Sequence, residues 1–329
     1  MRNVVSSGRH QIPTVLTVAL IVIYASLYGD PSGLAVGVNM MVAAIASIGL
    51  TLAIGSAGQL ALGQAGFMAI GAYGTAYLML AKGWNFLLAL VVSVLLALVL
   101  GALVGYIALR LRGHYLAMAT LAVGSGIYAL LQLPSRLGGA NGYSPIPLPE
   151  IFGHTYFQPK EQYYLVGVFL IIVLFLVRLL LLSRIGRELV AMRDDEVAAR
   201  TVGVNVTARK VQVFAIASAI GGIAGAVNAP LQTAIGPTLF SSAISLQLFV
   251  MVVIGGLGNI YGAVLGAGLV TYLIQAVPGS GSIALTILGV VVVLFMAILP
   301  HGIAGIPKMG RQMWERRLRS PPPTTESKS

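Results

Sequence analysis

The sequence predicts an all-α fold: a polytopic transmembrane bundle of about ten helices with glycine-rich packing, plus one helix outside the membrane. Of 329 residues, 57% are apolar and 9% are charged, whereas a soluble domain has about 25% charged residues. No charged residue occurs between Asp30 and Lys82, between Lys82 and Arg110, or across the 97 residues between Lys210 and Lys308. A helix needs about 20 apolar residues to cross the bilayer core. Most of the chain is therefore expected to lie in lipid.

The membrane spans follow from hydropathy, and their boundaries from charges, glycines and prolines. The first apolar run follows Arg2 and Arg9, but no convincing small-residue cleavage site precedes Asp30. We therefore expect an uncleaved first helix and not a signal peptide. The predicted helices cover residues 12–28, 33–54, 60–81, 86–109, 114–133, 162–182, 211–231, 240–258, 260–277 and 282–299.

The basic residues predict the orientation, because Lys and Arg concentrate in the short loops on the cytoplasmic side. With a cytoplasmic N-terminus, 17 of the 20 basic residues lie inside, and Lys82, Arg136 and Lys160 lie outside. Both termini are thus expected in the cytoplasm. The net charge of +11 does not indicate nucleic-acid binding, because the basic residues follow the ends of hydrophobic spans without aromatic interleaving. The expected surroundings are membrane lipid and no nucleic acid.

This topology divides the chain into a cytoplasmic tail (1–11), a transmembrane domain (12–307) and a second cytoplasmic tail (308–329). The outer loop at 134–161 is rich in turn-forming Asn, Gly and Pro and is a candidate docking surface for an external partner. The basic, Pro- and Ser/Thr-containing C-terminal tail cannot bury a core, so we expect it to be disordered.

Glycine is abundant, with 40 residues, and recurs at a spacing of four. In lipid, small residues allow helix backbones to approach closely, so we interpret these glycines mainly as packing residues. The pairs and the triplet are Gly33/Gly37, Gly101/Gly105, Gly221/Gly225 and Gly258/Gly262/Gly266.

Two similar strings, residues 54–59 and 254–259, both begin with Ile-Gly and lie at predicted cytoplasmic helix ends. They are consistent with a parallel internal repeat of the kind that transporters use. Two unrelated glycine-rich turns are the alternative.

The segment at residues 183–210 differs from its surroundings, because it holds ten of the 29 charged residues. Apolar residues punctuate its charges, and Glu196 and Arg200 have the spacing of a favourable helical ion pair. Glu196, Ala199 and Gly203 fall at i, i+3 and i+7, which predicts one helical face that a partner can approach closely. We predict a cytoplasmic docking helix. The alternative is a solvated interhelical loop, which is usually shorter.

This segment also carries a resemblance. The residues from Glu196 to Ala199, followed by Gly203, look like the EAA-type coupling motif of ABC importer permeases. The wider string from Gly186 to Asn205 is similar to the branched-chain amino acid permease family, specifically its M-type subunit. Two further signatures of that family are matched by residues 56–73 and 253–258.

The resemblance implies a permease subunit of the bacterial inner membrane with one cytoplasmic coupling helix. Its implied partners are an H-type permease, two cytoplasmic ATP-binding subunits and a periplasmic substrate-binding protein. The implied function is import of branched-chain amino acids. A urea or short-amide importer is one alternative, and an ion-coupled carrier or channel acting alone is another. The coupling residues are expected to be Gly186, Arg187, Arg193, Asp194, Asp195, Glu196, Ala199 and Gly203.

The residues themselves agree with a subunit energised by others. A P-loop needs a Gly-rich backbone followed by Lys and Ser/Thr, and the Gly-rich stretches lack that Lys. A proton-driven carrier usually keeps ionisable residues within the membrane, but these spans have no carboxylate between their ends. The absence of cysteine excludes thiolate metal sites. We predict no catalytic residue, cofactor or metal.

The run from Gly55 to Gly74 is the best candidate for a broken or re-entrant segment on the substrate path, because irregular backbone at membrane depth needs a cavity or protein around it. A freed helix N-terminus suits a carboxylate, and side-chain amides suit an ammonium group. The alternative is close packing, with the glutamines bonded to backbone. The candidate path residues are Gly58, Gln59, Gly63, Gln64 and Asn228, of which Gln64 stands where the resembled family more often has His.

Overall fold

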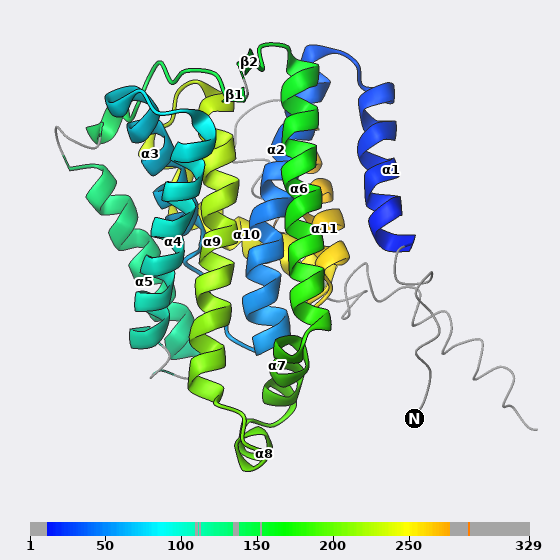
Figure 1. Cartoon of the computed structure of the whole chain (residues 1–329), viewed down its shortest axis with the longest axis vertical. Helices are drawn as coiled ribbons and strands as arrows, with labels where there is room; N and C mark the ends of the chain where they lie inside the picture. The colour runs from blue at the N-terminus through cyan, green and yellow to red at the C-terminus, as the bar shows by residue number, and fades with distance from the viewer. Residues whose placement is uncertain are drawn as a thin grey trace, which may run out of the picture.

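The computed structural model describes residues 12–108, 111, 113–133, 138–151, 153–276 and 289. Within these residues the chain is a helical bundle (Figure 1), so the predicted all-α class is confirmed. The predicted helix at 282–299, except Gly289, and both tails lie outside the described residues. The α-helices are α1 (Ile12–Leu27), α2 (Pro31–Thr51), α3 (Gln64–Lys82), α4 (Phe86–Ala108), α5 (His114–Leu131), α6 (Pro159–Leu182), α7 (Arg184–Asp194), α8 (Glu196–Thr201), α9 (Val206–Gln232), α10 (Ser242–Gly255) and α11 (Ile260–Ala276).

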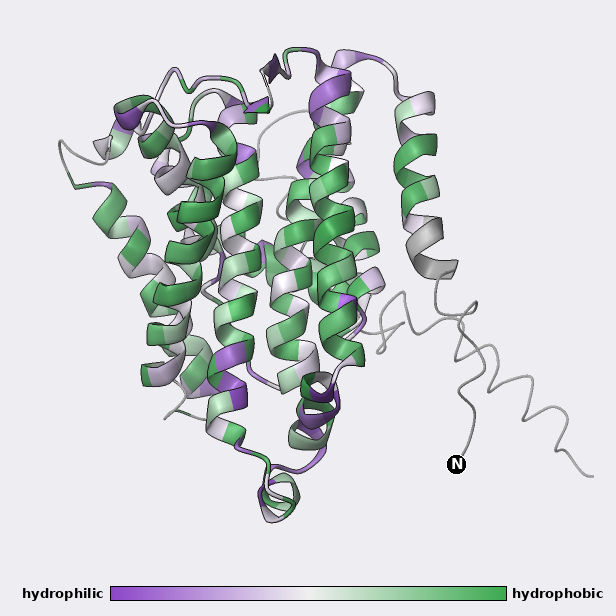
Figure 2. Cartoon of the chain, in the orientation of Figure 1, coloured by the Kyte–Doolittle hydropathy of each residue, from purple (hydrophilic) through white to green (hydrophobic). Residues whose placement is uncertain are grey.

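Five helical stretches in the described part of the chain are long and apolar enough to cross a membrane: α2 with its extension, α4, α5, α6 and α9. Helix α10 is apolar but has 14 residues, which span about 21 Å of a core about 30 Å thick. Figure 2 shows the bundle mostly green, with purple residues at its two ends and on α7 and α8. The apolar pattern therefore defines a membrane-spanning body with polar ends.

Helix α9 is central and packs against α2, α3 and α4. A Cβ on Gly71 would lie 2.0 Å from the carbonyl oxygen of Gly222, and one on Gly225 would lie 1.9 Å from that of Met68. Glycine at these positions lets the backbones of α3 and α9 touch. A Cβ on Gly101 of α4 would lie 2.4 Å from the Ser218 Cβ of α9. The geometry favours the packing interpretation of these glycines.

Helix α9 also begins five residues before the predicted start at residue 211, because Asn205 caps it. The Asn205 Oδ1 accepts a hydrogen bond from Ala208 N at 3.1 Å. The charged residues Arg209 and Lys210 therefore belong to the helix, which extends beyond its apolar stretch.

The chain breaks between α2 and α3. Helix α2 continues as a π-helical turn, η1 (Leu52–Ser56), residues 58–63 are not helical, and α3 starts at Gln64. The expected start of this helix at residue 60 is therefore wrong, and the predicted irregular run is irregular only in its first part. Two contacts with α5 explain the late start. Leu62 N donates to Thr120 Oγ1 at 2.9 Å, and a Cβ on Gly63 would lie 2.4 Å from the Thr120 carbonyl oxygen.

The end of the bundle opposite α7 and α8 carries the loop between α5 and α6 (Figure 1). This loop contains a 3-10 turn, η2 (Gly139–Asn141), and a hairpin of β1 (Glu150–Ile151) and β2 (His154–Thr155), which pair antiparallel. A β-bridge joins Tyr143 to Ile235. The bridge fastens the loop to the segment between α9 and the 3-10 turn η3 (Pro237–Phe240), which leads into α10.

Candidate functional site

The charged segment 183–210 folds into two short helices, α7 and α8, which project from one end of the bundle (Figure 1). Ser183 starts α7, because its Oγ accepts a hydrogen bond from Ile185 N at 3.1 Å. Gly186 permits the bend from α6, since a Cβ there would lie 2.0 Å from the Leu181 carbonyl oxygen. The expected single coupling helix is thus a pair of helices.

Helix α7 is anchored to the bundle by an apolar face. Leu189 and Met192 are 0% and 2% exposed, whereas Val190 between them is 54% exposed. The helix contacts η1, α6 and α9. Because a solvated loop would have no such buried face, α7 is a packed element of the bundle, and its opposite face is exposed.

The extended backbone of Asp195 separates α8 from α7. Asp195 caps α8, because its Oδ1 accepts hydrogen bonds from Val197 N at 2.8 Å and Ala198 N at 3.1 Å. The expectation that Glu196, Ala199 and Gly203 share a helical face is wrong. Ala199 is buried, and Gly203 lies beyond the end of α8 with a φ of 85°, in the left-handed region that favours glycine. The Asp195 cap starts a helix too short to carry that face.

Two carboxylates tie these helices to α9. Glu188 accepts hydrogen bonds from Arg184 at 3.0 Å and from Arg209 at 2.5 Å. Burial acts to raise the pKa of Glu188, but the hydrogen bonds and charges of the two arginines outweigh it and hold that pKa below its ordinary value of 4.5. Glu188 is therefore ionised at neutral pH and joins α7 to α9.

Glu196 makes the predicted ion pair with Arg200, at 4.0 Å, and a hydrogen-bonded pair with Lys210 of α9. Helical spacing could not predict the second pair, because 14 residues separate the two side chains. Exposed ion pairs contribute about 0–1 kcal/mol each, so these contacts orient α8 more than they stabilise the fold.

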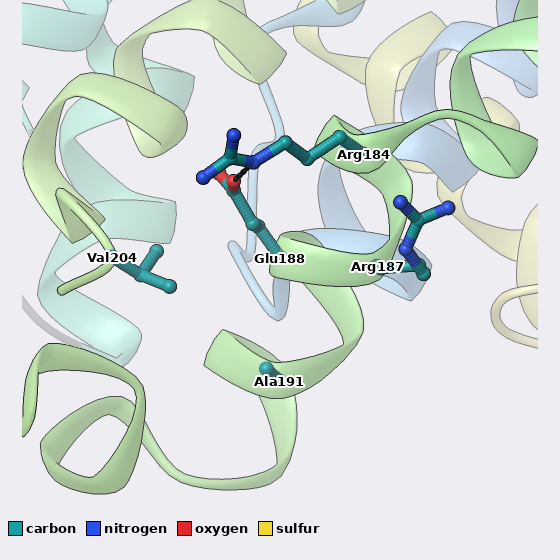
Figure 3. A pocket seen from close by; sticks show the side chains of 5 residues that line it. All are labelled: Arg184, Arg187, Glu188, Ala191 and Val204. Atoms are coloured by element: carbon teal, nitrogen blue, oxygen red, sulfur yellow. Dashed lines mark hydrogen bonds and ion pairs between the residues drawn. The ribbon is translucent and has the colours of Figure 1, made fainter. Parts of the chain in front are cut away.

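A hollow of about 500 Å³ opens between α7 and the start of α9 (Figure 3). Arg184 and Glu188 meet on one side of it, and Val204 faces them across the gap. Arg187 points away from that pair in the view, and its Nη1 donates to the Leu182 carbonyl oxygen at 3.4 Å. The wall of the hollow is therefore mixed, part charged and part apolar.

Arg193 reaches from the last turn of α7 to the broken segment. Its Nη1 donates a hydrogen bond to the carbonyl oxygen of Gly55, in η1, at 2.5 Å. Asp194, the next residue, is exposed. Of the predicted coupling residues, Arg193 thus connects the projecting helices to the interior of the bundle.

The candidate path residues divide into two groups. The Gln64 amide is taken up by backbone, since its Nε2 donates to the carbonyl oxygens of Ala46 at 3.3 Å and Ala217 at 3.1 Å. In contrast, both amide atoms of Gln59 and the Oδ1 of Asn228 are buried without a hydrogen-bond partner among the described residues. The structure therefore leaves Gln59 and Asn228 with unused polar groups, whereas Gln64 joins α2, α3 and α9.

Gly58 and Gly63 lie at the two ends of the break. Gly58 has a φ of 66° and lies near the Arg193 side chain, and Gly63 packs against α5. Two polar residues that the sequence did not single out support the break: Thr120 accepts from Leu62 N, and the Ser245 Oγ accepts from Ala65 N at 3.0 Å. No local signal could have identified these two, because they lie 58 and 180 residues from their partners.

The family model described as "Branched-chain amino acid transport system / permease component" matches residues 34–299. The chain is 33% identical over 287 residues to the high-affinity branched-chain amino acid transport system permease protein LivM of Salmonella typhimurium, an alignment that covers 80% of this chain and 68% of the relative. LivM of Escherichia coli has the same identity and coverage.

The homologous LivH permease of Salmonella typhimurium is 25% identical over 219 residues, covering 63% of this chain and 69% of the relative. No solved structure matches the chain. The match extends from α2 past α11 and includes both the broken segment and the pair α7–α8. The chain therefore belongs to the branched-chain amino acid transport system permease family, the membrane-spanning permease subunits of ABC importers.

Proposed function

We propose that this chain is the M-type permease subunit of an importer that carries branched-chain amino acids across the bacterial inner membrane. Its partners are an H-type permease, two cytoplasmic ATP-binding subunits that supply the energy, and a periplasmic substrate-binding protein. The names of the relatives support the substrate class. The observation that carries the coupling role is the pair α7–α8, in which α7 is anchored to the bundle by its buried face and the tip at α8 exposes Val197 and Val202.

The distribution of basic residues supports an orientation of the chain in the membrane. The end that carries α7 and α8 holds seven basic residues from Arg178 to Lys210, whereas Lys82 and Lys160 lie at the opposite end. By the positive-inside rule, the α7–α8 end faces the cytoplasm. Residues 12–307 then form the permease domain with both termini inside, and the loop at 134–161 faces the periplasm, where a binding protein docks.

We define the coupling surface as Val197, Val202 and Gly203, at the tip formed by α8 and the turn after it. The valines are 73% and 77% exposed, and a Cβ on Gly203 would meet nothing within 4 Å. Exposed apolar surface outside the membrane is typical of interaction sites, and we assign this tip to docking. An ATP-binding subunit is the partner that an energised permease requires on this side.

The other coupling residues act by shaping this surface. Gly186 sets the angle of α7, Asp195 starts α8, and Ala199 packs its inner face. Glu196 ties α8 to α9. An interaction helix transmits force only if the two states of its partner bind it differently, so the role is mechanical and not catalytic.

Along the substrate path, Gln59 and Asn228 supply the polar groups. An amide presents both a donor and an acceptor, which suits the carboxylate and the ammonium group of an amino acid. Gln64, Gly58 and Gly63 hold the break in shape. We assign substrate contact to Gln59 and Asn228 because they have buried polar atoms without a hydrogen-bond partner among the described residues.

The test of the coupling surface is Val197→Asp. A buried, unpaired carboxylate costs several kcal/mol, so the ATP-binding subunits should no longer co-purify, and leucine uptake should fall about tenfold or more. Asn85→Asp, which adds the same charge at the opposite end, should keep both. If Val197→Asp retains subunits and uptake, the coupling surface is wrong. Uptake that survives deletion of the ATP-binding subunits would overturn the proposal that these subunits supply the energy.

The substrate class is tested separately by competition. Uptake of labelled leucine should be blocked by unlabelled isoleucine and valine but not by urea or acetamide. Titration of the cognate binding protein with the same compounds should give the same order. Preference for urea or acetamide in both assays would replace the proposed substrate with a short amide.

A further inference from the structure

Three elements meet where α7 touches the bundle. Gly55 of η1 and Gly258, in the turn between α10 and α11, are in backbone contact, since a Cβ on Gly55 would lie 2.3 Å from Gly258 Cα. Arg193 of α7 lies against both: its Nη1 bonds the Gly55 carbonyl oxygen at 2.5 Å and would be 3.0 Å from a Cβ on Gly258. We call these three residues the arginine junction. It joins the two similar strings, residues 54–59 and 254–259.

The chemistry of the junction favours a cation there. At the end of a helix the carbonyl groups lack helical partners and carry partial negative charge. Gly58 N and Gln59 N bond the carbonyls of Ile54 and Ala53, and Arg193 bonds that of Gly55. A hydrogen bond from a guanidinium is charge-assisted and stronger than a neutral one. Gly258, with a φ of 89°, leaves room for the guanidinium.

Both turns lead into the interior. Three residues after Gly55 the chain enters the break that carries Gln59, whose amide has no hydrogen-bond partner in the described part of the chain, and then α3. The turn at Gly258 follows α10, whose Ser245 holds the first turn of α3 through Ala65 N. The arginine junction is thus connected to both sides of the α3 N-terminus.

We propose that Arg193 is a positioning residue of transport: it makes the two glycine turns follow α7 when the ATP-binding subunits move that helix. The inference rests on the proposed function. Docking belongs to the coupling surface on α8, and transmission belongs to the arginine junction. Loss of Arg193 should therefore leave the complex assembled. The movement of α7 should then no longer reach the substrate path.

The experiment uses a nitroxide label on Leu257→Cys. Leu257 is half exposed in the junction turn, and this chain has no other cysteine, so it is labelled alone before it is assembled with its partners. Label mobility is compared with and without a non-hydrolysable ATP analogue in the assembled transporter. The comparison covers the labelled parent, Arg193→Met, Arg193→Lys and a matched control, Arg184→Met. Arg184 lies on the same helix with its side chain 84% exposed.

We expect the label to respond to nucleotide in the parent and in Arg184→Met. In Arg193→Met, the ATP-binding subunits still co-purify, but the response disappears and uptake falls about tenfold or more, as for a lost charge-assisted hydrogen bond. Arg193→Lys restores part of both. A nucleotide response in Arg193→Met equal to the parent's overturns the inference, as does loss of the ATP-binding subunits from that variant. If the parent itself binds no such subunits, the proposed function fails first and the inference with it.

Discussion

Replacing Gly55 by Ala puts one methyl group into the closest backbone contact of the arginine junction. The added Cβ would lie 2.3 Å from both Cα and N of Gly258. Ordinary contact begins at 3.4 Å, so the turn must retreat by about 1 Å, and because the obstacle is backbone, no change of rotamer relieves it.

The cost has two parts. Overpacking a buried site costs about 1–3 kcal/mol. A retreat of this size also disturbs the hydrogen bond from Arg193 to Gly55, and loss of a bond to a charged group costs about 1.5–3 kcal/mol. We expect a total loss of about 2.5–6 kcal/mol in the free energy of unfolding, with reduced uptake.

The free energy of unfolding is measured by SDS titration in mixed micelles. Gly268→Ala is the matched control, because a Cβ on this helical glycine meets nothing within 4 Å. Its free energy of unfolding should be unchanged or higher, since Ala favours helix over Gly by about 1 kcal/mol. If Gly55→Ala is as stable as Gly268→Ala, the contact between the two turns is not as tight as described, and the reasoning fails.

Three further predictions concern polar groups. Gln64→Leu should lower the free energy of unfolding by about 1–2 kcal/mol in the same titration, because it removes two hydrogen bonds to backbone; an unchanged value would contradict that role. Asp195→Ala should destabilise α8 by about 1 kcal/mol, seen as faster hydrogen exchange of its amides, whereas Asp194→Ala should not. Because the pKa of Glu188 is lower in the folded chain, its contribution is complete above pH 4.5 and is lost as pH falls through the folded value. The difference in thermal midpoint between wild type and Glu188→Gln should therefore be constant at neutral pH and shrink in acid; a difference that grows in acid would reverse the assigned sign.

Hydropathy predicts the helices well where lipid decides the structure. The helices α4, α5 and α6 begin within three residues of their expected starts, because runs of apolar side chains end where charges begin. The same rule misses the start of α9, where the Asn205 cap and not the bilayer sets the boundary. A helix cap is a local feature, so the sequence does contain the signal for this boundary, namely Asn205. A boundary placed from the charged residues alone misses it.

Long-range contacts explain the remaining misses. The start of α3 depends on Thr120 and Ser245, which are distant in sequence and carry no motif. The pairing of Glu196 with Lys210 depends on how α8 folds back onto α9. For Gln64, the sequence left substrate contact and backbone bonding open, and the bonds to two carbonyl oxygens favour the second.

The lack of charge within the spans bears directly on how energy can enter this chain. Between Asp30 and Lys82 there is no charged side chain and no histidine, so an ion moving through α2, the break and α3 would meet no carboxylate, ammonium, guanidinium or imidazole group. The broken segment is instead held by backbone contacts, and a charge reaches it from outside the membrane, through Arg193. Because a guanidinium stays protonated at any physiological pH, that contact changes by movement and not by titration. This arrangement supports our proposal that the chain is driven mechanically at α7 by a partner that supplies the energy.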